Sequence, residues 1–423
     1  MKLSTGMSDS NQHHGKFHVD MSGATSAAHI LKIIRNHDGV SRAELSRITG
    51  LSRSTISQHV DTLQKMELVC ESGTARSTGG RKARLLQFKK DGGYVISIDL
   101  GATSLSVALC GLEAEPVAVD MRDCDVAASP CETINRAQRI VSELMESAGV
   151  DQSQIRGVGM GVPGPIEFKT GTLVGPAILR GWNKYPIANA LQSRFGCPAY
   201  VDNDANVMAL GELWAGAGKG AENFIFVKIG TGIGAGIVCG GQLYRGADGC
   251  AGDIGHVAVD YSDVMCACGN TGCLEALAAG GAIARRAERA AVEGTSQILA
   301  ELMRDHGQLT AKDIGLAALK GDPVSAEIIR DSGRSIGMVI AKAITFFNPS
   351  LVIIGGRVSK TGDLLLASIR ESVYRRSLPL ATRNLLVQSS TLDDRAGIIG
   401  AAVLVLEELF SPNRIAQVIA DSS

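Results

Sequence analysis

Apolar side chains recur at helical spacing in three short segments near the N-terminus, with polar breaks between them. The first segment covers residues 27–35. Ser41 is a good N-cap for the second segment, because Glu44 stands at the capping-box position and Gly50 can end the helix. The third segment covers about residues 52–66. Two short helices joined by a glycine turn form the helix-turn-helix pattern, so the third helix is predicted to read DNA.

The predicted third helix carries small hydroxyls, an amide and an arginine near its start, which are side chains that major-groove helices use on base edges and phosphates. Two strand-like runs, at 68–71 and 84–88, flank a loop rich in glycine and basic residues that is typical of a wing. We therefore predict a winged helix-turn-helix over residues 22–90, after a flexible tail at 1–21. The predicted DNA-binding residues are Ser52, Arg53, Ser54, Thr55, Ser57, Gln58, Arg76, Arg81 and Lys82.

Beyond residue 93 the apolar pattern changes to strands that end in glycine-rich turns. A strand at 94–99 leads into a turn at Gly101 and then a second strand. The same arrangement recurs at 224–229, where the turn is Gly230-Thr231-Gly232, and a further strand ends at Gly355-Gly356. Backbone amides of such turns can cradle a phosphate, because glycine permits close approach. The repetition predicts two similar α/β halves whose strand ends meet at one cleft.

Charge is distributed unevenly over the 423 residues. Residues 22–90 hold 12 Lys and Arg against 5 Asp and Glu, so this stretch carries +7 and the remainder −8 within a net charge of −1. A basic module on an acidic body predicts operator DNA as a partner. A helical dimerisation module with a solvated basic face is the alternative, and the predicted wing argues against it. Apolar runs fall short of the ~18 residues that span a bilayer, and the start lacks a signal-peptide core, so we expect a cytoplasmic protein without a membrane span.

Three of the ten cysteines, Cys266, Cys268 and Cys273, crowd into eight residues, whereas the other seven are scattered as expected of buried free thiols. His256 stands ten residues before them and is one of two histidines beyond residue 90. Three thiolates and one imidazole form a closed tetrahedral zinc site, with no open position for a catalytic water. We predict that these four residues bind a structural Zn²⁺, against the alternative of free thiols beside an unrelated histidine.

The segment Asp253-Ile-Gly-His256, followed by Cys266-Ala-Cys268-Gly-Asn-Thr-Gly-Cys273-Leu-Glu275, resembles the signature of the ROK family (repressors, open reading frames, kinases). With the helix-turn-helix in front, the chain resembles ROK transcriptional repressors of the xylose and N-acetylglucosamine regulator type. The resemblance implies an N-terminal winged helix-turn-helix followed by a two-lobed, actin-like (ribonuclease H-like) α/β sugar-kinase fold. It places the first lobe at 93–204 plus about 396–412, and the second, with the zinc site, at 205–395. It also implies a homodimer or homotetramer.

The same resemblance implies two sets of residues in the cleft between the lobes. The implied sugar-binding residues are Asn203, Asp204, Asp253, His256 and Glu275. The implied nucleotide-binding residues, if ATP and Mg²⁺ are bound, are Asp99, Gly101, Thr103, Gly230, Thr231, Gly232, Gly355 and Gly356. In a ROK kinase the residue at the position of Asp204 is the catalytic general base.

Four positions depart from the kinase pattern. Ala102 and Ser104 stand where kinases prefer glycine and lysine, which restricts the backbone and removes a positive charge from the first phosphate loop. Asp253 stands where glutamate is usual, and Ile178 where sugar kinases commonly have asparagine. The first two departures weaken ATP binding, whereas the last two indicate a different sugar preference.

Three functions are left open by these residues. The leading hypothesis is a transcriptional regulator, a repressor of carbohydrate uptake or catabolism genes, whose effector is a sugar or sugar phosphate. The second is an ATP-dependent sugar kinase that also binds DNA. The third is a regulator controlled by a protein partner. The first is favoured because the sugar half of the cleft is largely kept while the ATP half is altered.

Overall fold

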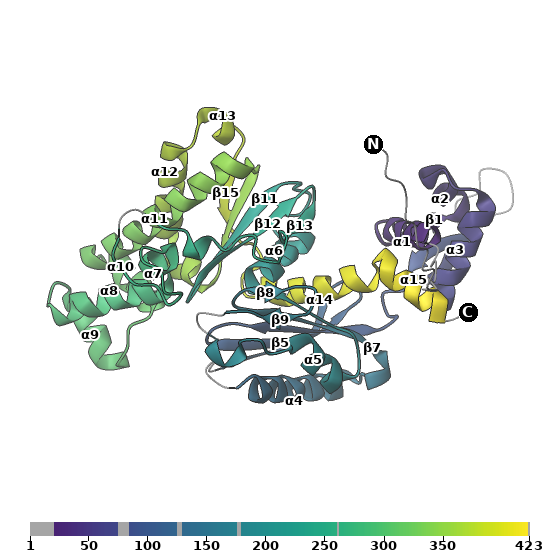
Figure 1. Ribbon diagram of the computed structural model, residues 1–423, viewed down its shortest axis with the longest axis horizontal. Coiled ribbons are helices and arrows are strands. Elements are labelled where there is room, and N and C mark those ends of the chain that lie inside the picture. Colours follow the sequence, from purple (N-terminus) through teal and green to yellow (C-terminus); the bar gives the residue numbers. More distant parts are fainter. Residues whose placement is uncertain (1–20, 75–83, 125–128, 176–178, 260–261, 422–423) are drawn as a thin grey trace, which may run out of the picture. The chain divides into compact units, whose positions relative to one another are not determined.

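The chain forms two compact units, one containing the residues up to Lys89 together with those from Glu408 onward, and the other containing Lys90–Glu407. The elements of both are labelled in Figure 1. This computed structural model describes residues 21–74, 84–124, 129–175, 179–259 and 262–421. The tail predicted at 1–21, apart from its last residue, lies outside the described residues, as does Ile178.

The first unit has the predicted helix-turn-helix. Ser41 and Glu44 form a reciprocal capping box at the start of α2, and Gly50 ends this helix in the left-handed conformation at φ 72°. Ser52 caps α3 by accepting from the Thr55 N–H. The sheet of this unit has the strand order β1-β3-β2. The elements are α1 (Met21–Arg35), β1 (Val40–Ser41), α2 (Arg42–Thr49), α3 (Arg53–Lys65), β2 (Val69–Thr74) and β3 (Arg84–Phe88).

A helix from the far end of the sequence, α15 (Pro412–Asp421), completes this unit by packing on α1. The guanidinium of Arg35 lies 5.3 Å from the ring centre of Phe88 and 4.7 Å from that of Phe410. These two rings meet edge to face at 5.8 Å. The sequence pattern assigns the residues beyond 412 to neither domain, and the contact with α1 places them with the helix-turn-helix.

The second unit contains two five-stranded sheets with the same connectivity (Figure 1). The orders are β10-β7-β4-β5-β6 and β15-β14-β11-β12-β13. In each sheet the first three strands in sequence pair antiparallel one after another, the fourth pairs in parallel with the first, and the fifth pairs in parallel with the fourth. This duplication agrees with the two similar α/β halves predicted from the repeated glycine turn, and with the two-lobed, actin-like fold that the resemblance to the ROK family implies. The strands are β4 (Tyr94–Leu100), β5 (Ser104–Gly111), β6 (Pro116–Asp123), β7 (Ile155–Val162), β10 (Ala199–Asn203), β11 (Phe224–Ile229), β12 (Ile233–Cys239), β13 (Gln242–Tyr244), β14 (Leu351–Gly355) and β15 (Leu386–Ser389).

Helices cover both sheets, and each lobe has its own apolar core. α4 and α5 pack on the first sheet, whereas α6 contacts strands of both sheets. A small hairpin, β8 (Ile166–Glu167) and β9 (Thr172–Leu173), follows β7. The helices are α4 (Pro130–Ala148), α5 (Ile187–Phe195), α6 (Asp204–Ala215), α7 (Leu274–Ala278), α8 (Gly280–Val292), α9 (Gln297–His306), α10 (Ala311–Leu319), α11 (Pro323–Phe347), α12 (Asp363–Arg376), α13 (Pro379–Thr382) and α14 (Arg395–Leu409).

Residues 396–406 of helix α14 are all buried, so the helix is apolar on every side and not on one face alone. Glycines let it approach its neighbours closely. A Cβ on Gly159 of β7 would lie 2.1 Å from the Ala401 carbonyl oxygen, and a Cβ on Gly400 would lie 1.7 Å from that of Val207 in α6. Among the described residues no single helix is long and apolar enough to cross a membrane. Only α14 and α15 taken together, which are bent by 57° at the break between them, reach the necessary length and apolar composition.

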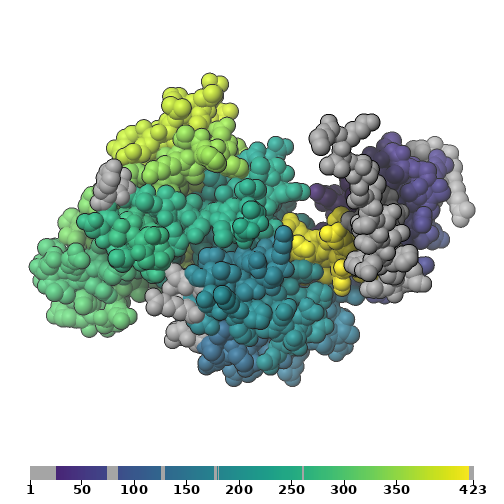
Figure 2. Space-filling view, viewed as in Figure 1, coloured from purple at the N-terminus to yellow at the C-terminus, as the bar shows by residue number. Residues whose placement is uncertain are grey.

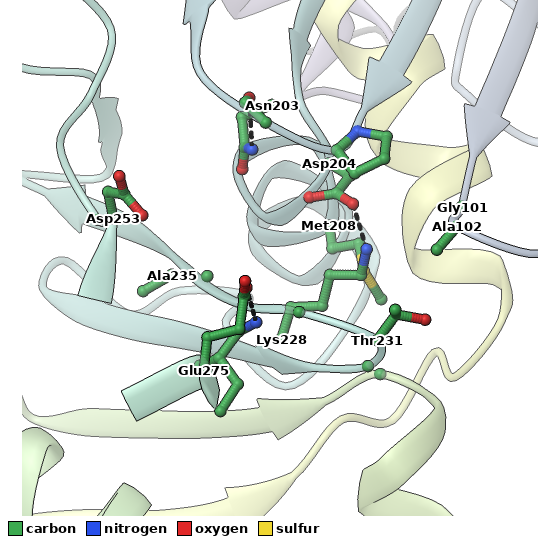
Figure 3. A pocket seen from close by; sticks show the side chains of 18 of the residues that line it. Gly101, Ala102, Asn203, Asp204, Met208, Lys228, Thr231, Ala235, Asp253 and Glu275 are labelled. Atoms are coloured by element: carbon green, nitrogen blue, oxygen red, sulfur yellow. Dashed lines mark hydrogen bonds and ion pairs between the residues drawn. The ribbon is translucent and has the colours of Figure 1, made fainter. Parts of the chain in front are cut away.

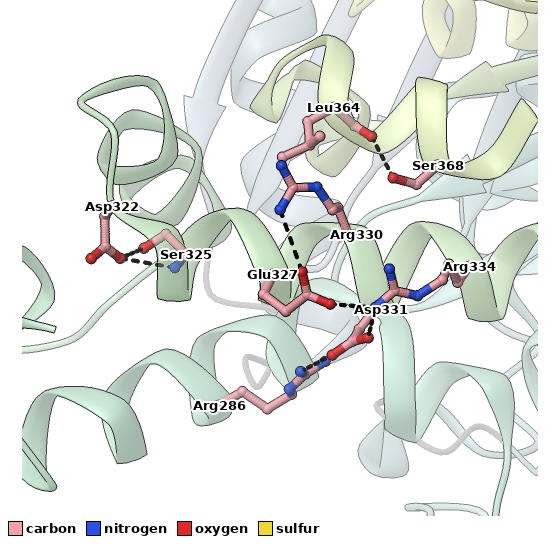
Figure 4. A network of polar contacts seen from close by, with 9 residues as sticks. All are labelled: Arg286, Asp322, Ser325, Glu327, Arg330, Asp331, Arg334, Leu364 and Ser368. Atoms are coloured by element: carbon pink, nitrogen blue, oxygen red, sulfur yellow. Dashed lines mark hydrogen bonds and ion pairs between the residues drawn. The ribbon is translucent and has the colours of Figure 1, made fainter. Parts of the chain in front are cut away.

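Charged side chains join α8 to α11 on the outside of the second lobe (Figure 4). Arg286 donates to Asp331 at 2.5 Å, and Asp331 also pairs with Arg334. Glu327 accepts from Arg330 at 3.3 Å and from Arg334 at 2.5 Å. Such exposed pairs each contribute only about 0–1 kcal/mol. On the face shown in Figure 2, side chains of the first lobe (blue) and of the second lobe (green) adjoin.

Candidate ligand cleft, metal centre and nucleic-acid interface

A cavity of about 460 Å³ lies where the strand ends of the two sheets meet. Its walls come from the segments that follow β4, β7 and β10 of the first sheet and β11 and β14 of the second. The volume lies within the usual range for small-molecule sites. Ligands of open α/β sheets bind at such carboxyl ends of strands. The cavity is therefore the candidate ligand site (Figure 3).

The predicted sugar-binding residues all line this cavity: Asn203, Asp204, Asp253, His256 and Glu275. Asn203 caps helix α6, because its Oδ1 accepts from the Ala205 N–H at 2.9 Å. Its Nδ2 donates to the Gly164 carbonyl oxygen at 3.0 Å, which fixes the amide from both ends. Asp204 follows as the first residue of α6, with only 7% of its side chain exposed.

The two acids from the second lobe have different surroundings. Glu275, on α7, accepts from the Ile233 N–H at 3.0 Å, and burial raises the pKa of this carboxyl. Asp253 has 46% of its side chain exposed, and its Oδ1 lies 4.0 Å from His256 Nε2. Glu275 is held by a backbone amide and Asp253 is more open, and both carboxylates are suited to accept hydrogen bonds from ligand hydroxyls.

The predicted nucleotide-binding residues also line the cavity, with one exception. The exception is Gly355, which packs on the core: a Cβ there would lie 2.5 Å from the Phe226 ring. Its lack of a side chain therefore serves strand packing. Those that line the cavity are Asp99, Gly101, Thr103, Gly230, Thr231, Gly232 and Gly356.

Two amides of the glycine turns are used within the turns themselves. Gly101 N–H donates to the Ser104 carbonyl oxygen at 2.8 Å, and Gly230 N–H donates to that of Gly232 at 2.9 Å. Each bond closes its hairpin, so neither amide is directed at a ligand phosphate in this structure. Ser104 stands where the kinase pattern has lysine, and its Oγ would lie 2.7 Å from a Cβ on Gly101.

Asp99 lies at the end of β4 under the cavity. Burial, with a smaller contribution from the neighbouring Asp204, raises the pKa of its carboxyl to about 6, although Lys228 and Arg357 lower it. The carboxyl also abuts α14, since a Cβ on Gly397 would lie 2.3 Å from Asp99 Oδ2.

The cavity also contains basic side chains that were not predicted from the sequence: Lys228, Arg357 and Lys360. Lys228 forms an ion pair and hydrogen bond with Asp204 Oδ2. A sequence signal for Lys228 existed, because it is the single charged residue in the apolar strand Phe-Ile-Phe-Val-Lys-Ile. Arg357 directly follows the glycine pair after β14, which is a weaker signal.

The four predicted zinc ligands converge, with their ligand atoms all within 4.8 Å of one another. Cys268 Sγ lies 3.7 Å from Cys273 Sγ, and Cys266 Sγ lies 3.6 Å from His256 Nδ1. Two thiolates bound to one tetrahedral zinc at about 2.3 Å lie about 3.8 Å apart, so these distances fit that ion. His256 thereby presents Nδ1 to the thiols and Nε2 towards Asp253.

The start of α3 presents four predicted DNA-binding residues, Ser52, Arg53, Ser54 and Gln58, as exposed side chains. Thr55 is half-buried and bonded to Ser52 Oγ at 2.8 Å.

Ser57 is engaged inside the domain, because its hydroxyl accepts from Arg42 Nη1 at 2.9 Å. The same guanidinium reaches Asp61 at 3.0 Å, which ties α2 to α3. The predicted wing residues Arg76, Arg81 and Lys82 lie outside the described residues.

Comparison with known proteins agrees with this architecture. Residues 95–408 match the ROK family, and residues 28–69 match a winged helix-turn-helix DNA-binding domain. A putative xylose repressor of Caldicellulosiruptor sp. is 35% identical over 383 residues, covering 90% of this chain and 95% of that protein. A glucokinase of Halalkalibacterium halodurans is 39% identical over 258 residues, covering 61% of this chain and 78% of that protein.

Two solved structures are similar to this chain, one over nearly its whole length and the other over about three quarters of it. A ROK family transcriptional regulator, described as a homologue of the E. coli MLC protein, has a TM-score of 0.81 at 26% identity and covers 95% of this chain and 100% of its own. A ROK glucokinase from Streptomyces griseus in complex with glucose and AMPPNP has a TM-score of 0.64 at 31% identity, covering 74% and 99%. The chain therefore belongs to the ROK family and carries a winged helix-turn-helix domain in front of its ROK fold.

Proposed function

We propose that this protein is a sequence-specific DNA-binding transcriptional regulator, a repressor of carbohydrate uptake or catabolism genes, with a sugar or sugar derivative as effector. The observation that carries the proposal is the presence, in one chain, of a complete helix-turn-helix with an exposed recognition helix and a cleft lined by hydroxyl acceptors. The similarity to a xylose repressor over 90% of the chain supports the same assignment.

The DNA-binding residues of the proposal are the exposed ones at the start of α3, namely Ser52, Arg53, Ser54 and Gln58, with Thr55 beside them. A helix N-terminus of this composition suits base edges and phosphates of the major groove. As a homodimer the protein would meet half-sites about one helical turn, or a multiple of it, apart. The basic residues Arg76, Arg81 and Lys82 are proposed to contact phosphate or the minor groove as a wing.

The sugar-binding side of the cleft is proposed to use Asp253, His256 and Glu275 from the second lobe. Opposite them it would use Asn203, the last residue of β10, and Asp204, the first residue of α6. A desolvated site of paired acceptors distinguishes ligands well, because each unmade hydrogen bond is costly. A structural Zn²⁺ on the Cys3His cluster would fix the His256 ring and so orient Nε2 towards the ligand.

The experiment is an operator titration in the presence of sugars. DNA fragments selected by the full-length protein from its own genome are used in gel-shift assays with D-xylose, D-glucose, N-acetyl-D-glucosamine and their 6- or 5-phosphates. We expect one of these to change operator affinity at least tenfold, while a matched sugar epimer does not. If operator binding is tight and no compound in an extended sugar panel changes it, the proposed effector role is wrong and control by a protein partner takes its place.

A sugar kinase is the second candidate function, favoured by Asp204 in the cleft and by the 39% identity to a glucokinase. In that case ATP and Mg²⁺ would lie along Asp99, Thr103 and the turn at Gly230. Against it stand Ala102 and Ser104 in the first loop and the internal turn bonds of both loops. A coupled ADP-release assay with the same sugars tests this candidate, and turnover above background would establish it.

A further inference from the structure

Lys228 is placed unlike any other residue of β11, since it is a lysine in a strand of buried apolar side chains. In the sheet it stands opposite Gly234 on one side and Gly355 on the other. Its methylene chain runs beside the glycine turn, with Cε 3.8 Å from the position of a Cβ on Gly230. The side chain is 21% exposed and lines the cavity.

The Lys228 ammonium group is directed at Asp204 (Figure 3). Its Nζ forms both a hydrogen bond and an ion pair with Oδ2 of this carboxylate, whose side chain is 7% exposed. A buried charge of this kind is strongly disfavoured when its partner is removed. One of the two carboxylate oxygens with which Asp204 could accept a sugar hydroxyl is therefore already bonded within the protein.

Polar groups on the nucleotide side of the cleft are also engaged by basic side chains. Arg357 Nη1 donates to Thr103 Oγ1 at 2.8 Å, which joins the segment after β14 to the turn after β4. Lys360 Nζ pairs with Asp394 at 2.8 Å. The side of the cavity that would hold phosphates in the kinase hypothesis is thus lined by cations that are paired with polar groups of the protein.

We propose that Lys228 is an internal counter-ion that occupies Asp204 in the place of a ligand hydroxyl, and thereby sets ligand affinity and prevents the cleft from turning over its sugar. A hydroxyl that binds to Asp204 must share or displace the ammonium group, so binding is weakened relative to an open carboxylate. The ammonium group also competes with that hydroxyl for the carboxylate that would take its proton. Lys228 is a specificity-determining residue, and the proposal rests on the proposed sugar-binding function of this cleft.

The test is a double-mutant cycle on the full-length protein with Lys228→Met, Asp204→Asn and the double variant. Methionine keeps the length of the chain and removes the charge. Lys342→Met, on the exposed side of α11, controls for the loss of one positive charge. Sugar binding is measured by isothermal titration calorimetry with the sugar that the operator titration identifies, and with D-xylose and D-glucose.

We expect Lys228→Met to bind the sugar at least fivefold more tightly than the wild type, and Lys342→Met to match the wild type within twofold. Asp204→Asn should bind weakly, and adding Lys228→Met to it should give no gain, because the lysine acts through Asp204. The wild type should release no sugar-dependent ADP from MgATP. Equal or weaker binding by a folded Lys228→Met, or efficient turnover by the wild type, would overturn the proposal.

Failure of this proposal can be told apart from failure of the proposed function. If the wild type binds a sugar and Lys228→Met binds it no better, the counter-ion role is wrong and the effector role stands. If neither protein binds any sugar while both bind operator DNA, the effector role itself is wrong, and this proposal with it. Folding of each variant is checked by tryptophan fluorescence, because Trp182 and Trp214 both lie in the second unit.

Discussion

Replacing Asp99 by asparagine should stabilise the second unit at alkaline pH and leave it unchanged at acid pH. Burial raises the pKa of this carboxyl from 3.8 to about 6, whereas in the unfolded chain it returns to its ordinary value. The folded state therefore binds more protons than the unfolded state between about pH 4 and pH 6. Stability consequently falls as pH rises through this window, and the full penalty is present above pH 6.

The size of the effect follows from the shift. A difference of about two pKa units, at 1.36 kcal/mol for each unit, corresponds to about 3 kcal/mol at pH 8. Asparagine has nearly the shape of the protonated acid and carries no charge at any pH, so it should recover up to this amount. At pH 4 the folded carboxyl is neutral but the unfolded one is still about half ionised, so most of the gain, though not all of it, should be lost. Gly397, which abuts the carboxyl, leaves room for the isosteric side chain and for little more.

Urea unfolding followed by tryptophan fluorescence between pH 4 and pH 8 is the assay, since both tryptophans of the chain belong to the second unit. Asp123→Asn, at the exposed end of β6, controls for the loss of one carboxylate. A difference in unfolding free energy between Asp99→Asn and the wild type that is equal at pH 4 and pH 8 would refute the reasoning. A loss of stability at pH 8 would do so as well, because it would mean that the ionised carboxyl is held by Lys228 and Arg357 more strongly than burial disfavours it.

Three further predictions concern other parts of the chain. Cys268→Ser should release zinc and abolish the sugar response while leaving operator binding intact, as measured by metal content and gel shift; unchanged metal content would exclude this ligand set. Arg245→Met should lower the unfolding free energy of the second unit by about 3 kcal/mol, because it unpairs the buried Asp202 that Arg245 Nε contacts at 2.6 Å; an unchanged urea midpoint would contradict this. Phe410→Ala should cost the first unit about 1–2 kcal/mol by removing one of the two rings beside Arg35, and should speed hydrogen exchange in α1 as well as α15. Faster exchange confined to α15 would show that the contact does not stabilise the unit.

Local features of this protein were predictable because they depend on residues close together in the sequence. The capping box of Ser41 and Glu44 spans three residues and Gly50 ends the same helix, so propensity and hydrogen bonding decide these ends without help from the rest of the chain. The clustering of Cys266, Cys268 and Cys273 needs only a tight turn. The two glycine turns revealed the duplication of the sheets because each connects adjacent strands of one hairpin.

Contacts across the fold could not be predicted in the same way. Glu212 is fully buried and accepts from the Ala217 N–H at 2.7 Å and from Ser390 and Leu392, nearly 180 residues further on. A glutamate in an apolar helix gives no indication of which distant donors will satisfy it. The sequence of α15 is also amphipathic, but this pattern does not indicate which element its apolar face contacts. That element is α1, at the other end of the chain.

The helix-turn-helix, the repeated glycine turns and the Cys3His cluster can all be recognised in the sequence, because each depends on residues that lie only a few positions apart. The state of the cleft cannot, because it depends on contacts between segments that lie far apart in the chain. The lysine on β11 reaches Asp204 because the two sheets bring their strand ends together. Chain connectivity does not encode that meeting; the packing of the two lobes around α6 and α14 does.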